Sequence, residues 1–287
     1  MDKALKAHIE YLLCIKINTI SPISGGDISK AFLLETESER FFCKINREAD
    51  ALKMFEAEKL GLEVISETNT IAVPKVLLCE PLEIGAFLLM EHIEPKRPSK
   101  KDFELLGHQL AALHKFSESD AFGLGTDNFI GSLPQSNKTR SSWTKFYVQE
   151  RLLPQLQLAR VGSLIQYSEI PSEERLFKTC ENLFPEVKPS LLHGDLWGGN
   201  YLISKEGTPY LIDTAIYYGH HEVDIAMTRL FGGFDRAFYG AYQEHFPPVG
   251  GKKQRSDIYQ LYFLLVHLNL FGSSYKFRVV TILERYF

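Results

Sequence analysis

The segment LLHGDLWGGNYLISKEGTPYLIDTAIYYGHHEVDIA, residues 191–226, holds the densest group of chemically active side chains in this sequence. Asp195 precedes Asn200 by five residues and Asp213 by eighteen. Apolar runs before and after the sequence SKEGTP predict two short strands, and a hairpin of these strands would bring Asp213 beside the loop from Asp195 to Asn200. The predicted strands are residues 201–203 and 210–212.

Phosphoryl transfer to a hydroxyl needs the three groups that this hairpin would bring together. One carboxylate orients the acceptor hydroxyl and takes its proton, while an amide oxygen and a second carboxylate hold the metal ion that bridges the nucleotide phosphates. The alternative is that HGD is only a turn and that Asp213 only ends a strand. Three oxygen-bearing side chains at this spacing favour the interpretation as a phosphotransferase.

The composition is that of an ordinary globular protein and excludes several classes of function. Of the 287 residues, 45% are hydrophobic and 24% charged, which rules out wholesale disorder. The net charge of -4 leaves no basic field to hold nucleic acid or an anionic membrane. The four cysteines lie far apart with no CxxC pair, which argues against a zinc ribbon or a disulfide scaffold. We therefore expect a reduced, cytoplasmic enzyme.

No targeting or membrane segment is expected. The N-terminus, MDKALKAHIEYLLCIKI, is too charged for a secretory signal. The longest apolar stretch, residues 258–271, contains Gln260, His267 and Asn269, so a buried helix is expected there and not a membrane span.

The first third of the chain predicts short strands with one long helix, and the rest predicts mostly helix. A connector rich in proline and lysine, residues 94–100, separates the two patterns. We therefore expect an N-terminal lobe of residues 1–95 and a C-terminal lobe of residues 96–287. The predicted elements are helices at residues 4–15, 49–65 and 102–116, a hairpin at 21–36, and strands at 40–45, 73–79 and 85–91.

The N-terminal lobe contains a candidate ion pair. Lys44 lies inside the apolar strand over residues 40–45, where an unpaired ammonium group would be costly. Glu58 lies on the apolar stripe of the following helix, whereas Glu56 points to another face. A carboxylate on a buried helix face is best explained as the partner of Lys44, and a kinase needs such a pair to hold the nucleotide phosphates. The alternative is a surface lysine and a solvated glutamate. The stripe consists of Ala51, Phe55, Leu62 and Ile65.

The sequence SGGDIS, residues 24–29, lies ahead of this pair and lacks the full GxGxxG pattern. Its glycines need only form a hairpin turn. Their place before Lys44 favours a loop whose backbone N–H groups approach the phosphates. The predicted nucleotide contacts in this loop are Gly25, Gly26 and Asp27.

HGDLWGGN, followed by LIDTAIYYGHHEVDIAM and FGGF, resembles the fructosamine kinase (ketosamine 3-kinase) family. That family is a branch of the protein-kinase-like phosphotransferases, alongside aminoglycoside and choline kinases. The HGD-x4-N…D core alone indicates only the superfamily. The tryptophan after HGDL, the YYGHxEVDxAM run and LVHLNLFG at residues 265–272 narrow it to the family. The resemblance runs from about residue 10 to the C-terminus.

The resemblance implies a bilobal α+β fold, with a small antiparallel sheet in the N-lobe and a mostly helical C-lobe. Asp195 resembles the catalytic base, and Asn200 and Asp213 resemble the magnesium ligands. Lys44 would grip the ATP phosphates, with Glu58 holding it.

The strand GAFLLMEHI, residues 85–93, resembles the hinge beside the adenine pocket. Met90 would line that pocket, while the Glu91 carbonyl and the Ile93 N–H would meet the adenine edge.

Two residues are candidates for contact with the acceptor. Trp197 would cover the acceptor sugar, with ordinary core packing as the alternative. His267, with Asn269, would reach the acceptor cleft or form a buried polar pair. Thr139 stands where the family usually has an aromatic residue, and Thr214 where it usually has proline. The residues between 122 and 151 that match the family pattern are Asn128, Gly131, Gln135, Asn137, Trp143, Phe146 and Arg151.

Other polar residues of the motif are expected to be structural. His193 would hydrogen-bond nearby backbone and fix the catalytic loop, with a role in proton transfer as the alternative. Asp224 would cap its helix and brace the Asp195 loop. No chemistry follows from His220 or Glu222. The histidines show no HExxH spacing, so no zinc site is expected.

The resemblance implies an ATP- and magnesium-dependent kinase that phosphorylates the 3-hydroxyl of a small or protein-bound ketosamine, a deglycation activity. A kinase for an aminoglycoside, a choline-like compound or another amino alcohol would share the core residues. A nucleotide-binding pseudokinase would need no catalytic base, and a phosphoesterase would need more metal ligands. The preference between fructosyl and ribulosyl adducts and the oligomeric state stay open.

Overall fold

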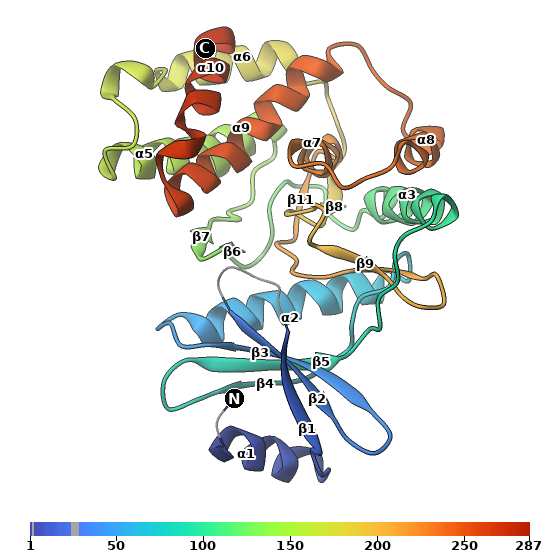
Figure 1. Cartoon of the computed structure of the whole chain (residues 1–287). Coiled ribbons are helices and arrows are strands. Elements are labelled where there is room, and N and C mark those ends of the chain that lie inside the picture. Colours follow the sequence, from blue (N-terminus) through green and yellow to red (C-terminus); the bar gives the residue numbers. More distant parts are fainter. Residues whose placement is uncertain (2, 24–28) are drawn as a thin grey trace.

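A five-stranded antiparallel sheet forms the N-terminal part of the computed structural model, which describes residues 1, 3–23 and 29–287 (Figure 1). The strand order is β1-β2-β3-β5-β4. The strands are β1 (Thr19–Ile23), β2 (Lys30–Glu35), β3 (Arg40–Asn46), β4 (Val76–Pro81) and β5 (Ala86–Glu91). Helices α1 (Lys3–Leu13) and α2 (Ala51–Glu67) belong to the same part of the chain.

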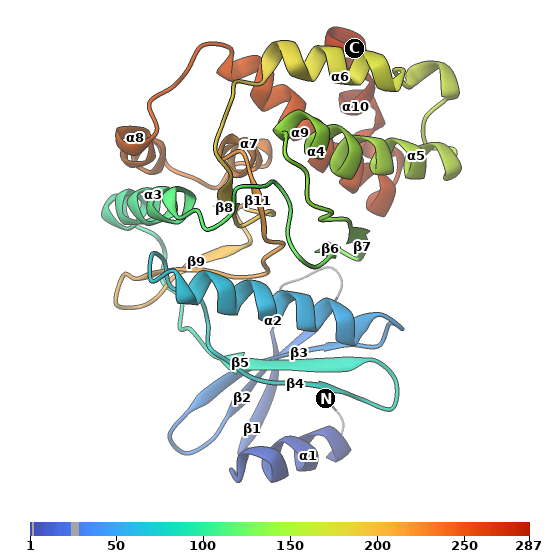
Figure 2. The same ribbon diagram turned by 180° about the vertical axis from the view of Figure 1, so that it is seen from behind.

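The two faces of this sheet are covered by different helices because side chains alternate along each strand. Phe41, Cys43 and Ile45 of β3 pack in one apolar cluster with Leu5 and Ile9 of α1. Phe42, on the opposite face of β3, packs in a second cluster whose buried members include residues of α2. Figures 1 and 2 show α1 below the sheet and α2 above it. Lys44 therefore lies on the face that α2 covers.

The rest of the chain is mostly helical and packs around α9 (Lys252–Phe271), whose buried side chains belong to the largest apolar cluster. The other helices are α3 (Lys100–Lys115), α4 (Trp143–Phe146), α5 (Leu153–Val161), α6 (Glu173–Leu183), α7 (Glu222–Leu230), α8 (Arg236–His245) and α10 (Lys276–Tyr286). A π-helical turn at Tyr147–Leu152 joins α4 to α5. Three short strand pairs are present: β6 (Asn128–Ile130) with β7 (Leu133–Gln135), β8 (Ser190–Leu192) with β11 (Tyr217–Gly219), and β9 (Tyr201–Ile203) with β10 (Pro209–Leu211).

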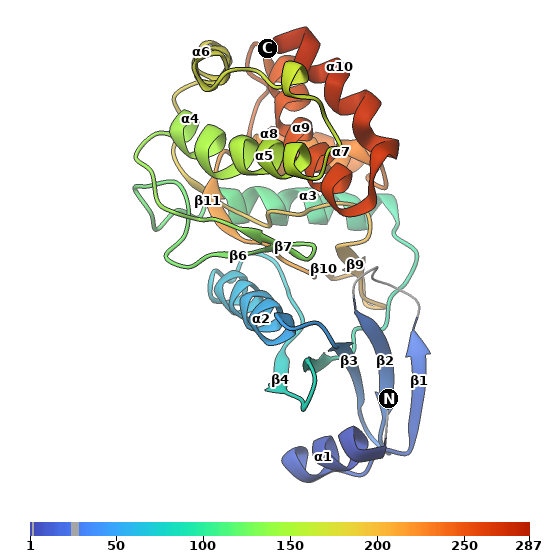
Figure 3. The same cartoon turned by 90° about the vertical axis from the view of Figure 1, so that its left-hand side faces the viewer.

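The β9–β10 hairpin is joined by backbone hydrogen bonds to the segments that leave the sheet and α2. Lys96 N–H donates to Ile203 O, and Lys205 N–H donates to Glu94 O, each at 2.9 Å. On the second strand, Leu211 N–H donates to Ala72 O at 3.0 Å. Figure 3 shows the hairpin between the sheet and the helices. The boundary predicted between residues 95 and 96 falls in this connection.

The predicted elements occur with shifted ends. The strand expected over residues 73–79 begins at Val76, because Pro74 has no N–H to donate to a neighbouring strand. The helix expected over residues 49–65 begins at Ala51 and ends at Glu67. The apolar stretch 258–271 lies in α9, and no helix of the described residues is long and apolar enough to cross a membrane.

Arg151 is fully buried and connects the loop after β7 to the helical core. Its guanidinium donates to Ser136 O at 2.5 Å and to Asn137 Oδ1 at 2.7 Å. The same group lies 4.0 Å from the centroid of the Tyr217 ring and 4.6 Å from that of Phe146. Since a buried cation is tolerated only when it is hydrogen-bonded, these contacts make Arg151 a structural residue.

We expect Arg151→Met to lower the free energy of unfolding by about 2–4 kcal/mol, because the apolar side chain leaves buried acceptors unsatisfied. Urea unfolding followed by circular dichroism measures this change. Arg160→Met, at an exposed position of α5, is the control and should change stability little. Equal effects of the two substitutions would contradict the structural role of Arg151.

Candidate active site

The β9–β10 hairpin places Asp213 beside the loop from Asp195 to Asn200, as the sequence predicts. Tyr201 pairs with Leu211, and Ile212 N–H donates to Asn200 O at 3.1 Å. The loop itself closes through Asn200 N–H, which donates to Trp197 O at 3.0 Å. The HGD sequence is therefore followed by a hydrogen-bonded loop that is joined to the hairpin, and is not an isolated turn.

Asn200 links the two aspartates through its side chain. Its Nδ2 donates to Asp195 O at 2.8 Å and lies 3.3 Å from Asp195 Oδ2 and 3.5 Å from Asp213 O. Because the amide is planar, these contacts on Nδ2 turn Oδ1 away from the loop backbone. The amide oxygen is thus placed as a possible metal ligand.

Lys44 connects the sheet, α2 and the hairpin. Its Nζ lies 2.7 Å from Glu58 Oε1, and it also forms an ion pair with the Asp213 carboxylate. The Lys44 and Glu58 side chains are each 12% exposed, which confirms the predicted pair and excludes the alternative of two solvated side chains. Asp213 adopts a left-handed backbone conformation, with φ of 55°, which is uncommon outside glycine.

The Asp195 loop is held from behind by the buried Asp224 of α7. Asp224 accepts hydrogen bonds from His193 N–H at 2.7 Å and Gly194 N–H at 3.0 Å. His114 Nε2, from α3, lies 3.0 Å from the same carboxylate. The predicted brace is therefore confirmed. The predicted cap is wrong, because Asp224 is the third residue of α7 and His221 occupies the N-cap position.

His193 has the structural role that the sequence predicts. Its Nδ1 accepts from Asp195 N–H at 3.2 Å, and its Nε2 lies 2.9 Å from Ile212 O. Since Nδ1 is an acceptor, Nε2 carries the proton and donates it to that carbonyl. Burial lowers the pKa of His193, which keeps the ring neutral. Both ring nitrogens are thus engaged in fixing the loop.

Asp195 is poised to accept a proton. Burial raises its pKa to about 7, the negative charge of Asp224 adds to this effect, and the hydrogen bond from Asn200 opposes it. A carboxylate with this pKa is a stronger base than an ordinary aspartate.

The donor set fits a magnesium ion. Asn200 Oδ1 and the Asp213 carboxylate both supply oxygen atoms, and the Asp213 side chain is 37% exposed, so an ion can reach it from solvent. Mg²⁺ prefers oxygen ligands and is commonly held by one or two protein groups together with nucleotide phosphates and water.

The residues predicted to meet the nucleotide base lie where β5 ends. Met90 is 3% exposed and packs in the apolar cluster between the sheet and α2. Glu91 N–H donates to Lys75 O at 2.9 Å, and its carboxylate accepts from Lys75 N–H. Ile93 follows in the connection to α3. Gly25, Gly26 and Asp27 lie outside the described residues.

The two predicted acceptor residues lie on different elements, Trp197 in the loop after Asp195 and His267 on α9. Trp197 is 40% exposed and its ring lies over Gly199, so the alternative of core packing is wrong. His267 Nδ1 donates to Phe263 O at 2.8 Å, and its ring packs beside Phe231. Asn269 Nδ2 donates to Gln155 O at 3.0 Å and to Gln155 Oε1 at 2.8 Å.

Two residues of the site are not predicted from the sequence. His114 lies on the buried stripe of α3, four residues after Leu110. A polar side chain on an apolar helix face is the same signal that indicates Glu58. Gly61 of α2 lies against Thr214, where an added Cβ would be 2.2 Å from Oγ1. This contact depends on residues far apart in sequence, and nothing in the local pattern signals it.

A family model described as fructosamine kinase matches residues 1–287. The chain belongs to the fructosamine kinase family. A probable ketoamine kinase of Enterococcus faecium is 39% identical over 277 residues, which cover 95% of this chain and 97% of the relative. The chloroplastic protein-ribulosamine 3-kinase of Arabidopsis thaliana is 39% identical over 278 residues, covering 94% and 83%.

Solved structures confirm the α+β kinase-like fold. The putative fructosamine-3-kinase of Haemophilus somnus superposes with a TM-score of 0.88 at 28% identity, covering 98% of this chain and 96% of that one. An aminoglycoside phosphotransferase in complex with ADP and hygromycin B shares the fold at a TM-score of 0.64 and 14% identity, covering 98% of both chains. Membership of the fructosamine kinase family identifies this chain as an ATP-dependent phosphotransferase.

The pKa of Asp195 predicts a pH-dependent cost in stability. An acid with a raised pKa in the folded state favours folding at low pH, and this contribution is lost as the pH rises from the unfolded value of about 4 to about 7. Asp195→Asn removes this dependence. The stability of the variant relative to the unmodified protein should therefore increase as the pH rises from about 4.5 to about 8.

Urea unfolding of both proteins at the two pH values measures this gain. Asp120→Asn, at an exposed position, is the control and should show no comparable trend. A difference in free energy of unfolding that stays constant with pH would contradict the raised pKa of Asp195.

The contact between Gly61 and Thr214 predicts that Gly61→Ala impairs the site. Alanine favours a helix over glycine by about 1 kcal/mol, but overpacking at such a contact costs about 1–3 kcal/mol. We expect the clash to displace Thr214 and its neighbour Asp213, so that turnover falls although the helix gains propensity. Thr214→Ala in the same chain removes the clashing hydroxyl and should restore turnover; failure of this rescue would refute the explanation.

Proposed function

We propose that this protein transfers the γ-phosphoryl group of ATP to the 3-hydroxyl of a ketosamine, either a small molecule or a protein adduct, in a deglycation reaction. The observation that carries the proposal is the assembly of Asp195, Asn200 and Asp213 next to the Lys44–Glu58 pair. The names of the relatives, ketoamine kinase and protein-ribulosamine 3-kinase, support the class of acceptor.

Asp195 orients the acceptor hydroxyl and takes its proton. A pKa of about 7 keeps a large fraction of the carboxylate ionised near neutral pH while making it a competent base. The hydrogen bond from Asn200 and the brace by Asp224 fix its position, so little reorganisation is needed when the acceptor binds.

Lys44 holds the α- and β-phosphates, and Glu58 keeps its ammonium group in place. Asn200 Oδ1 and the Asp213 carboxylate would hold Mg²⁺, which neutralises charge on the phosphates when bound. Met90, Glu91 and Ile93 are proposed to meet the adenine, and Gly25, Gly26 and Asp27 the phosphates, as the sequence predicts.

The acceptor is proposed to lie against exposed aromatic side chains beside Asp195. Trp197 follows the base by two residues, and Phe231, also 40% exposed, packs on His267. The backbones of Gly198 and Gly233 adjoin, which brings the segment after Phe231 to the Trp197 loop. An amphipathic acceptor such as a sugar on an amine could place its apolar face on these rings. The cytoplasmic location predicted from the sequence stays a prediction.

A kinase for an aminoglycoside or another amino alcohol is the second candidate, since an aminoglycoside phosphotransferase shares the fold. The chemistry at Asp195, Asn200 and Asp213 would be the same. Only the acceptor separates the two candidates, so the test has to vary the acceptor.

We expect ATP-dependent phosphorylation of fructosyl- or ribulosyl-amines, with the product identified by its mass. Asp195→Asn should lower turnover by about two orders of magnitude or more and leave ATP binding largely intact, because the base acts only in the chemical step. Asp120→Asn, exposed and away from the site, should retain activity.

Turnover of aminoglycosides or amino alcohols but not ketosamines would overturn the acceptor and keep the kinase. ATP binding without turnover of any acceptor would favour a pseudokinase. Unchanged turnover in Asp195→Asn would refute the assignment of the base.

A further inference from the structure

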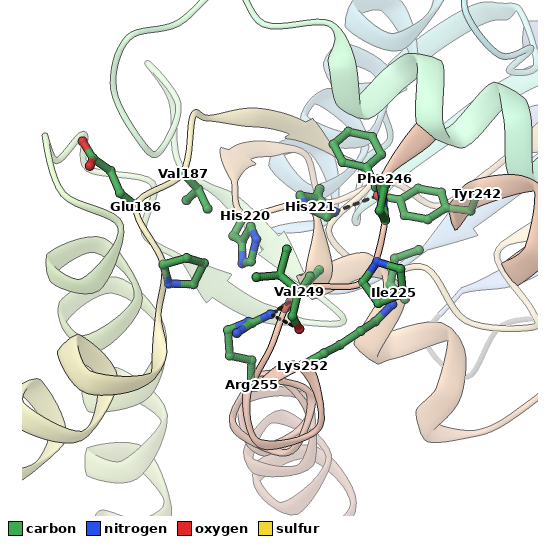
Figure 4. A pocket seen from close by; sticks show the side chains of 14 residues that line it. Glu186, Val187, His220, His221, Ile225, Tyr242, Phe246, Val249, Lys252 and Arg255 are labelled. Atoms are coloured by element: carbon green, nitrogen blue, oxygen red, sulfur yellow. Dashed lines mark hydrogen bonds and ion pairs between the residues drawn. The ribbon is translucent and has the colours of Figure 1, made fainter. Parts of the chain in front are cut away.

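A cavity of about 280 Å³ lies among the helices, between the start of α7, the start of α9, the residues after α8 and the segment before β8 (Figure 4). None of the residues proposed above to bind ATP, magnesium or the acceptor lines it. Its volume is near the lower limit of about 300 Å³ for small-molecule sites. Much of its wall is apolar, with contributions from Pro185, Val187, Ile225, Phe246, Pro248 and Val249.

One positive group around the cavity has no hydrogen-bonded or ion-paired partner among the described residues. Arg255 and Glu222 form a closed pair, with Nε–Oε2 at 2.6 Å and Nη2–Oε1 at 2.9 Å. Figure 4 shows the Glu186 carboxylate turned away from the other side chains. Lys252 also lines the cavity, and no residue in 1, 3–23 or 29–287 bonds its ammonium group. Burial lowers the pKa of Lys252, the Glu222 carboxylate opposes this effect, and the charges of Arg229 and Arg255 add to it.

His220 supplies a second unpartnered polar group. It is 2% exposed and lines the cavity, and its Nδ1 lies 2.7 Å from Tyr259 Oη. The Tyr259 oxygen accepts from Trp143 Nε1–H. Donation of the Tyr259 proton to His220 Nδ1 avoids leaving that buried proton without an acceptor, so Nδ1 is assigned as the acceptor. Burial and the charge of Arg255 lower the pKa of His220 to about 3, so the ring is neutral and its proton sits on Nε2. Within the described part of the chain, nothing accepts this N–H.

A chain of hydrogen bonds leads from the cavity wall to the catalytic loop. His221, which lines the cavity, has its Nδ1 2.9 Å from Tyr242 Oη. Tyr242 Oη lies 2.7 Å from His114 Nδ1, and His114 Nε2 lies 3.0 Å from Asp224. Asp224 in turn holds the backbone of the Asp195 loop. Phe246 stacks on the His221 ring at 4.1 Å between centroids. A ligand that packs against Phe246 would therefore affect the position of His221, the first residue of this chain of hydrogen bonds.

We propose that this cavity binds a small monocarboxylate with an apolar body, and that its occupancy is coupled to the Asp195 loop through His221, Tyr242 and His114. The ammonium group of Lys252 matches one negative charge, and the His220 N–H is a second donor in the cavity wall. The apolar wall accepts the body of the ligand. A phosphate dianion would carry a second charge that nothing in the cavity neutralises.

Benzoate is the probe for binding, titrated by calorimetry into the full chain without ATP or acceptor, so the result does not depend on the proposed function. We expect Lys252→Gln to weaken benzoate binding tenfold or more, because it removes the only ammonium group among the described residues that line the cavity. Lys253→Gln, the adjacent exposed lysine, is the matched control and should bind as the unmodified chain does.

Equal binding by Lys252→Gln and the unmodified chain would overturn the site. Equal binding of benzamide, the neutral analogue, would do the same. Tighter binding of phenylphosphate than of benzoate would overturn the assignment to a monocarboxylate.

Amide hydrogen exchange tests the coupling. We expect benzoate to slow exchange of the His193 and Gly194 amides, which donate to Asp224. Tyr242→Phe removes the hydroxyl that joins His221 to His114, and should keep benzoate binding while losing the effect on exchange. Unchanged exchange in the unmodified chain with benzoate bound, or the same slowing in Tyr242→Phe, would refute the coupling.

Discussion

The buried carboxylate of Asp224 is the group on which the position of the Asp195 loop depends. A charge in this position would be very unfavourable without partners. Burial raises its pKa, but the hydrogen bonds from the His114 side chain and the His193 backbone, with the electrostatic effect of both rings, outweigh burial and hold the pKa below its ordinary value. The ionised carboxylate then fixes two successive backbone N–H groups, those of His193 and Gly194, and so sets the position of Asp195.

The same charge also affects the pKa of Asp195. Asp224 lies close enough to Asp195 to add to the effect of burial on its pKa, while the hydrogen bond from Asn200 limits the rise. One carboxylate is stabilised as an anion and its neighbour is kept near the point of protonation. This division of roles between two acids arises from their partners, since both side chains are chemically identical.

The sequence predicts the parts of this site that are local or periodic. The hairpin between Asn200 and Asp213 follows from two short apolar runs around a turn, and Glu58 follows from its place on a buried stripe. Tyr242 could not be predicted, because its contact with His114 joins residues 128 apart in the chain. The exposure of Trp197 could not be predicted either, because it depends on how the Gly198–Gly199 backbone turns beneath the ring.

The backbone links of the β9–β10 hairpin have a mechanical consequence. The hairpin is bonded to the segments that flank the N-terminal sheet and α2, whereas the start of the Asp195 loop is bonded to α7. The residues on either side of Asp213 are nevertheless bonded to the Asp195 loop, because Ile212 O accepts from His193 Nε2–H and Ala215 N–H donates to His193 O, each at 2.9 Å. A rotation of the sheet against the helices would therefore strain the bonds between the hairpin and the sheet segments and leave the separation of Asp195 and Asp213 nearly unchanged. The contact that would change is the ion pair between Lys44 of the sheet and Asp213.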